Sequence, residues 1–93
     1  MSIVVRFHPT SLTADKYDES IRRLEQTDGG FPPEGLAFHV CFGSEGDLHV
    51  SEIWDSPEQL YAFGERLMPI LSEVGIEFSG EPEIFEVHHT IAR

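Results

Sequence analysis

A histidine and a glutamate on neighbouring predicted strands are the residues best suited to acid–base chemistry. His39 lies in the strand-like run Leu36 to Phe42, and Glu52 lies in the next such run, Asp47 to Asp55. A four-residue loop from Ser44 to Asp47 would pair the two positions directly across a hairpin. A carboxylate beside an imidazole orients the ring and raises its basicity. We therefore expect His39 to be a general base oriented by Glu52, and a histidine that only fills a cavity wall remains an equal alternative.

Two further polar residues are candidates for the same site. His88 is expected on an edge strand, with its side chain on the same face of the sheet as that of His39. It could therefore complete the site of a second subunit or make a hydrogen bond between subunits. Arg6 is expected on a strand beside Glu52, where a salt bridge is the plain interpretation and contact with a substrate carboxylate or enolate is the alternative. The predicted catalytic residues are therefore His39, Glu52, His88 and Arg6.

The five histidines do not form a predicted metal site. His88 and His89 are adjacent on a strand and point to opposite faces, and the hairpin register separates His39 from His49 in the same way. No HxH, CxxC or HExxH pattern occurs, so we expect no metal and no cofactor. Haem binding through His39 or His88 is a weaker alternative, because nothing else in the sequence favours it. The lone Cys41 is interpreted as a small buried side chain.

The periodicity of the sequence predicts the elements that position these side chains. We expect a loop at Thr27 to Gly35 and a hairpin turn at Gly43 to Gly46. The predicted strands and helices are strand Ile3 to His8, a helix over about 14–26 after Thr13, strands Leu36 to Phe42 and Asp47 to Asp55, a helix from Ser56-Pro57 to a cap at Gly75, and strand Glu83 to Ile91. The order β-α-β-β-α-β predicts one α+β domain over residues 1–93, with ferredoxin-like topology, a four-stranded antiparallel sheet and both helices on one face.

Alternation along the strands divides the predicted sheet into two faces. In each strand, one set of alternate residues is more apolar than the other, and we expect the helices to cover the face that these residues form. The residues of this face are Ile3, Val5, Phe7, Phe38, Val40, Phe42, Ser51, Ile53, Phe85, Val87 and Ile91. The opposite face mixes apolar and charged residues, so it is suited neither to full exposure to water nor to a dry core. A second copy packed on this face would enclose a cavity, so we predict a homodimer. The residues expected to contact a small apolar or aromatic ligand there are Trp54, Val50, Cys41 and Val4.

Composition excludes several classes of partner. Seventeen acidic against six basic residues give a formal charge of −11, which repels nucleic acid and anionic membrane surfaces. No apolar run approaches the roughly 20 residues of a spanning helix. Met1 to Arg6 enters a strand-like run without a secretory signal, and the single cysteine suits a reducing compartment, so we expect a cytoplasmic protein.

Four segments carry a resemblance that spans nearly the whole chain: Phe38-His39-Val40, Glu52 to Ser56, Arg66 to Pro69 with Leu71 and Gly75, and Phe85 to His88. In them the sequence resembles the small dimeric α/β barrel proteins related to antibiotic biosynthesis monooxygenases. The resemblance implies a dimer, a pocket between sheet and helices, and chemistry on small, often aromatic or polyketide-like compounds. In those monooxygenases an indole at the position of Trp54 lines the site, whereas Phe63-Gly64 stands here in place of their usual histidine.

Two functions follow from these observations. The first is a cofactor-independent enzyme that carries out oxygenation, isomerisation or lyase-type proton transfer, with His39 as base, Arg6 and His88 as anion stabilisers and Trp54 as an aromatic platform. The second is a non-catalytic dimeric module that binds or senses a ligand in the same pocket without turnover.

Overall fold

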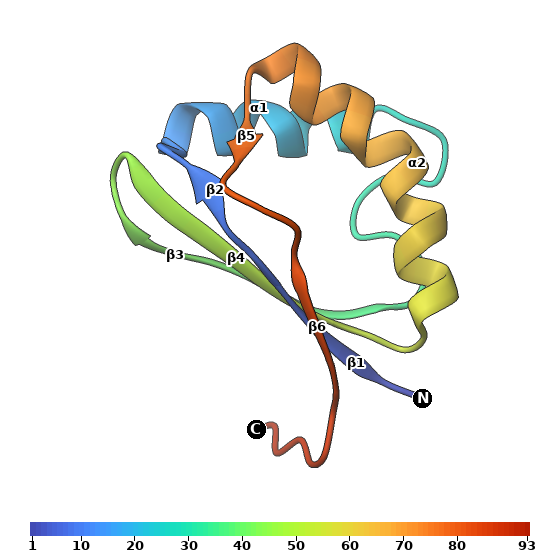
Figure 1. Cartoon of the computed structure of the whole chain (residues 1–93). Coiled ribbons are helices and arrows are strands. Elements are labelled where there is room, and N and C mark those ends of the chain that lie inside the picture. The colour runs from blue at the N-terminus through green and yellow to red at the C-terminus, as the bar shows by residue number, and fades with distance from the viewer.

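Two helices lie against one face of a four-stranded antiparallel sheet in the computed structural model, which describes residues 1–93 (Figure 1). The sheet has the strand order β3-β4-β1-β6, and a separate short ribbon pairs β2 with β5. The elements are β1 Ile3–Phe7, β2 Pro9–Thr10, α1 Ala14–Glu25, β3 Leu36–Ser44, β4 Asp47–Trp54, α2 Pro57–Val74, β5 Glu77–Phe78 and β6 Glu83–Glu86. The predicted ferredoxin-like α+β fold is confirmed, with β3 and β6 at the edges of the sheet.

Both helices begin where their capping residues predict. The Thr13 hydroxyl accepts a hydrogen bond from the backbone N–H of Lys16, and the Ser56 hydroxyl accepts one from the N–H of Gln59. Each bond satisfies one of the amide groups that a helix leaves free in its first turn. Gly75 ends α2 with φ of 87°, a left-handed conformation that glycine adopts without steric cost. Neither helix is long and apolar enough to cross a membrane.

The hairpin of β3 and β4 sets the position of the candidate pair. His39 lies opposite Glu52, and Ser44 lies opposite Asp47 across the turn, so the predicted register is confirmed. On the other side of β4, Glu52 lies opposite Val5 and Trp54 lies opposite Ile3 of β1. Because directly paired residues share a face, His39, Glu52 and Trp54 lie on the face that the helices cover.

The predicted assignment of faces is right for β1 and wrong for β3, β4 and β6. The helices cover the face of the sheet on which His39 and Glu52 lie. The opposite, open face carries Val4, Arg6, Phe38, Val40, Phe42, Ser51, Ile53 and Phe85. The prediction failed because β3 has apolar residues on both of its faces, so alternation alone does not show which face is covered. It also treated a histidine and a glutamate as unsuited to the interior, although polar groups that satisfy each other can be buried.

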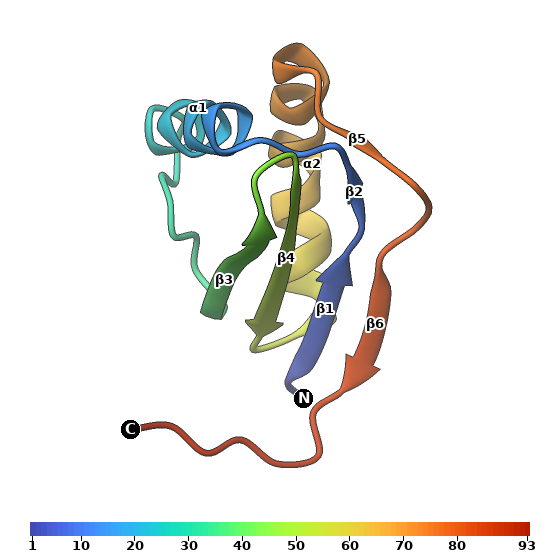
Figure 2. The same cartoon turned by 90° about the vertical axis from the view of Figure 1, so that its left-hand side faces the viewer.

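The last strand is shorter than predicted. β6 ends at Glu86 rather than at Ile91, because Glu86 lies opposite Ile3, the first residue of β1, and no strand extends beyond it to pair with. The Val87 N–H still donates to the Ser2 carbonyl oxygen at 3.0 Å. From there the chain leaves the sheet as an exposed tail, seen at the C-terminus in Figure 2. The predicted sheet position of His88 is therefore wrong.

Two glycines of the β3–β4 hairpin provide a matched test of this register. Gly43 (φ 117°) and Gly46 (φ 83°) both adopt positive φ, but only at Gly43 would an added Cβ approach backbone, 2.7 Å from the Asp47 carbonyl oxygen. We expect Gly46→Ala to lower the free energy of unfolding by about 1 kcal/mol and Gly43→Ala by roughly 3 kcal/mol. Urea denaturation measures both, and equal losses would contradict the hairpin geometry.

Candidate functional site

The carboxylate of Glu52 is buried on the helix-covered face of the sheet and is bonded through both oxygens. Its side chain is 4% exposed. The Trp54 indole N–H donates to Oε1 at 2.9 Å, and Nδ1 of His39 lies 2.6 Å from Oε2. Since a carboxylate oxygen accepts, Nδ1 carries the hydrogen of this bond, and the Nε2 lone pair faces the other way. The geometry predicted for His39 and Glu52 is thus present, with Trp54 as an additional donor.

Tyr17 on α1 makes a third contact in this chain of hydrogen bonds. Its Oη lies 2.6 Å from Nε2 of His39, and the two rings stack with centroids 5.9 Å apart. Burial, followed by the nearby Cys41 and Glu52, raises the pKa of Tyr17 to about 12. The phenol is therefore protonated at neutral pH and donates to Nε2. This leaves the lone pairs of Oη as acceptors for a ligand.

Tyr17 is not among the residues predicted from the sequence, because a tyrosine at helical spacing on α1 is typical of an apolar stripe. It falls at helical spacing with Ile21 and Leu24, which do face the interior. The available signal was that a tyrosine in such a stripe needs a hydrogen-bond partner when it is buried. The crossover from α1 to β3 places that hydroxyl next to His39.

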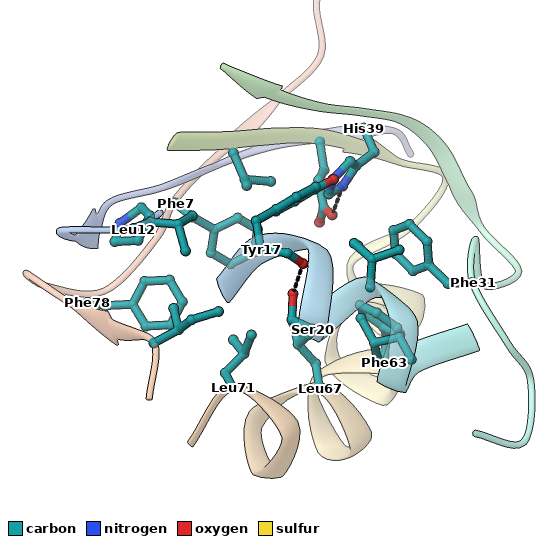
Figure 3. Close-up of a pocket in the computed structure, with 16 residues that line it drawn as sticks. Phe7, Leu12, Tyr17, Ser20, Phe31, His39, Phe63, Leu67, Leu71 and Phe78 are labelled. Carbon is teal, nitrogen blue, oxygen red and sulfur yellow. Dashed lines mark hydrogen bonds and ion pairs between the residues drawn. The ribbon is translucent and has the colours of Figure 1, made fainter. Parts of the chain in front are cut away.

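An apolar pocket opens beside these groups, between the helices and the sheet (Figure 3). Twelve of its 16 lining residues are hydrophobic, and its cavity volume is about 60 Å³. His39, Tyr17 and Glu52 form part of one wall. Figure 3 shows Phe7, Leu12 and Phe78 toward one end of the pocket and Phe31 and Phe63 toward the other. The arrangement can receive a mainly apolar molecule and present one acid–base group to it.

Of the predicted ligand contacts, Val50 lines this pocket, and the other three lie elsewhere. Trp54 is completely buried beneath it, packed against Phe63 with ring centroids 5.5 Å apart. Cys41 lies opposite Val50 on the covered face, outside the pocket wall, and burial raises its pKa. Val4 belongs to the open face. Trp54 therefore supports the site from the core instead of offering a platform to a ligand.

Arg6 and His88, two of the predicted catalytic residues, are not brought to the pocket. Arg6 pairs with Ser51 in the sheet, which places it on the face opposite to Glu52, and its guanidinium lies 3.8 Å from Glu83. The predicted salt bridge between Arg6 and Glu52 is therefore wrong, because the register puts Val5 opposite Glu52. His88 lies in the exposed C-terminal tail. No three His, Cys, Asp or Glu side chains are close enough together to hold a metal ion.

No family model and no curated protein matches the sequence, but its fold has close counterparts among solved structures. A protein of Deinococcus radiodurans, described as a candidate antibiotic biosynthesis monooxygenase, superposes with a TM-score of 0.60 at 12% identity, over 100% of this chain and 98% of that one. SnoaB of Streptomyces nogalater, described as a cofactor-independent oxygenase, gives 0.57 at 13% identity over 99% and 96%. The chain has the ferredoxin-like fold of these solved structures.

A third solved structure has more of its sequence in common with the chain. A candidate monooxygenase of Shewanella loihica is 25% identical, with a TM-score of 0.53, over 97% of this chain and 99% of that one. Because each superposition covers nearly all of both chains, the shared fold accounts for the whole chain, including both helices and all four strands of the main sheet.

The raised pKa of Tyr17 can be tested by alkaline titration. The absorbance difference between the parent and Tyr17→Phe should show one phenol that ionises near pH 12. Because the folded-state pKa is raised above its unfolded value, the unfolded chain loses this proton first. The contribution of Tyr17 to stability is then complete below about pH 10 and declines as the pH rises toward 12. A difference spectrum centred at pH 10 would contradict the burial of this hydroxyl.

Proposed function

We propose that the pocket removes a proton from a small, mainly apolar molecule that carries an acidic hydroxyl, and that it does so without a cofactor. The observation that carries this proposal is the continuous chain of hydrogen bonds from Tyr17 through His39 to Glu52, which ends on an apolar pocket. A base with an orienting carboxylate is the arrangement that general-base catalysis requires. An apolar surrounding excludes water, which strengthens the electrostatic interactions within the site.

The proton moves in two linked transfers. The substrate O–H donates to Oη of Tyr17 while the Tyr17 proton passes to Nε2 of His39, so that the phenol ends as it began. The products are a substrate oxyanion and an imidazolium, and the Glu52 carboxylate stabilises the positive charge through Nδ1. The proton that Tyr17 has received faces the oxyanion and stabilises it by a hydrogen bond. Tyr17 and His39 are therefore the catalytic residues, and Glu52 positions His39.

Two outcomes are open to the resulting anion. Return of the proton from the imidazolium to a carbon of the conjugated anion gives isomerisation. Reaction of that carbon with molecular oxygen, which serves as the oxidant, gives oxygenation. The description of SnoaB as a cofactor-independent oxygenase supports the second outcome, since that protein has the same fold.

One observation favours a second candidate function, a binding module without turnover. Both nitrogens of His39 already have protein partners, so a ligand could contact Tyr17 with no net transfer of a proton. In this case the hydrogen-bonded chain would serve to fix the rotamers that shape the pocket.

We further propose that a second copy of the chain covers the open face of the sheet. Phe38, Phe42 and Phe85 are 54%, 46% and 50% exposed there, and Val40 and Ile53 lie among them. A contiguous apolar face of this kind favours association. The homodimer predicted from the sequence is thus retained, but the predicted burial of the Val50 and Trp54 side is wrong, since the helices cover it. The pocket then lies within one subunit.

Proton removal is tested with three variants of the hydrogen-bonded chain and one control. In an assay of oxygen uptake and of deuterium exchange with small phenols and cyclic diketones, Tyr17→Phe, His39→Ala and Glu52→Gln should each lower turnover by about 100-fold or more. His88→Ala should leave it unchanged, because His88 lies in the tail. If the folded parent binds these compounds without turnover, the binding module is the correct function.

The dimer is tested by sedimentation at micromolar concentration. We expect the parent to be a dimer and Phe38→Glu to be a monomer, because the charge would be buried unpaired at the interface. Tyr61→Glu is the matched control, since Tyr61 is 61% exposed on α2, away from the open face. A monomeric parent would contradict the proposal.

A further inference from the structure

The loop between α1 and β3, residues Thr27 to Gly35, contributes an aromatic side chain to the pocket wall. Phe31 packs edge-on against His39, with ring centroids 5.3 Å apart and planes at 85°, and lies 6.1 Å from the ring of Phe63 (Figure 3). The sequence predicts only a connecting loop here. Its one aromatic residue lies next to the proposed base.

The pocket is too small for the ligands that its chemistry suits. Its cavity volume of about 60 Å³ is well below the roughly 150 Å³ of a cavity that accommodates benzene. A second hollow of about 260 Å³ lies on the outside, lined by Pro33, Glu34, Gln59, Ala62, Phe63 and Arg66. Phe63 borders both spaces. A movement of the aromatic wall would therefore enlarge the pocket toward this hollow.

Few hydrogen bonds hold the middle of the loop. Between residues 28 and 34, Arg66 Nη2 on α2 donates to the Gly30 carbonyl oxygen at 2.7 Å, and the Leu36 N–H at the start of β3 donates to the Pro33 carbonyl oxygen at 3.2 Å. Nη1 of the same guanidinium donates to the Thr27 hydroxyl at the start of the loop, and the group lies over the Phe63 ring at 4.9 Å. Segments with so few bonds open most readily. Arg66 thus joins the loop to the other half of the aromatic wall.

We propose that Phe31 is the gate of the pocket and selects ligands by size, and that Arg66 is a positioning residue that holds this gate closed. The inference rests on the proposed binding of a small ligand beside Tyr17 and His39. A ligand passes the gate with its apolar end first, toward Phe7 and Phe78, and its hydroxyl follows to Tyr17.

Size selection is tested with phenol and 2-naphthol as probes. Binding is followed through the indole N–H signal of Trp54, the only tryptophan of the chain, which also reports whether each variant is folded. We expect the parent to bind phenol more tightly than 2-naphthol, and Phe31→Ala to bind 2-naphthol about 10-fold more tightly than the parent does. Phe31→Leu, a milder truncation, should show the same trend if Phe31→Ala fails to fold.

The role of Arg66 is tested by rates rather than affinity. Lysine cannot bridge two acceptors as a guanidinium does, so Arg66→Lys should speed both association and dissociation of phenol by about 10-fold with little change in Kd. Arg22→Lys is the control, since Arg22 pairs with Glu19 on the outside of α1. Gly29→Ala should act like Arg66→Lys, because its Cβ would lie 3.2 Å from Nη2, whereas Gly30→Ala meets no atom within 4 Å.

The outcomes separate the gate from the proposed function. If the parent binds phenol but Phe31→Ala keeps the same preference and Arg66→Lys the same rates, the gate is wrong and the pocket remains a binding site. If neither phenol nor 2-naphthol shifts the Trp54 signal in the parent or in Phe31→Ala, the pocket is not a site for such ligands and both proposals fail.

Discussion

A buried carboxylate has to recover the hydration that it gives up on folding, and Glu52 does so with two donors held by the same sheet. The indole of Trp54 comes from the same strand two residues later, and the imidazole of His39 comes from directly across the hairpin. Removal of either donor would leave part of the charge unsatisfied, which is among the most destabilising changes a core can undergo. The register of β3 against β4 is therefore coupled to the electrostatics of the core.

The same constraint extends to the helices. With Nδ1 committed to Glu52, Nε2 of His39 must find its partner on the opposite side, and the phenol of Tyr17 supplies it from α1. One chain of hydrogen bonds thus runs along the covered face of the sheet and reaches the helix above it. No buried side-chain nitrogen or oxygen in the structure lacks a partner. The polar groups have defined positions in a pocket whose other walls are apolar and would allow several packings.

The fold and the central pair could be predicted from the sequence because both depend on local signals. Capping residues fixed the helix starts, and the length of the hairpin loop placed His39 opposite Glu52. The faces of the sheet could not be predicted from alternation, since β3 is apolar on both sides. Arg6 was expected beside Glu52 because Glu52 was assigned to the open face, and the face of each β4 residue relative to β1 depends on the β1–β4 register, which no turn between the two strands defines. Tyr17 required the packing of α1, which the sequence does not specify.

Alternate residues of each hairpin strand point to opposite faces of the sheet. One set faces the pocket, and the other forms part of the open apolar surface. Substitutions on one face can therefore accumulate without altering the other, so the pocket and the open surface are free to diverge separately among descendants of this chain. An insertion or deletion of one residue within β3 or β4 has the opposite effect, because it exchanges the two sets of side chains at once. Evolution of this domain through its strands should then proceed by replacement, while changes in length accumulate in the loops.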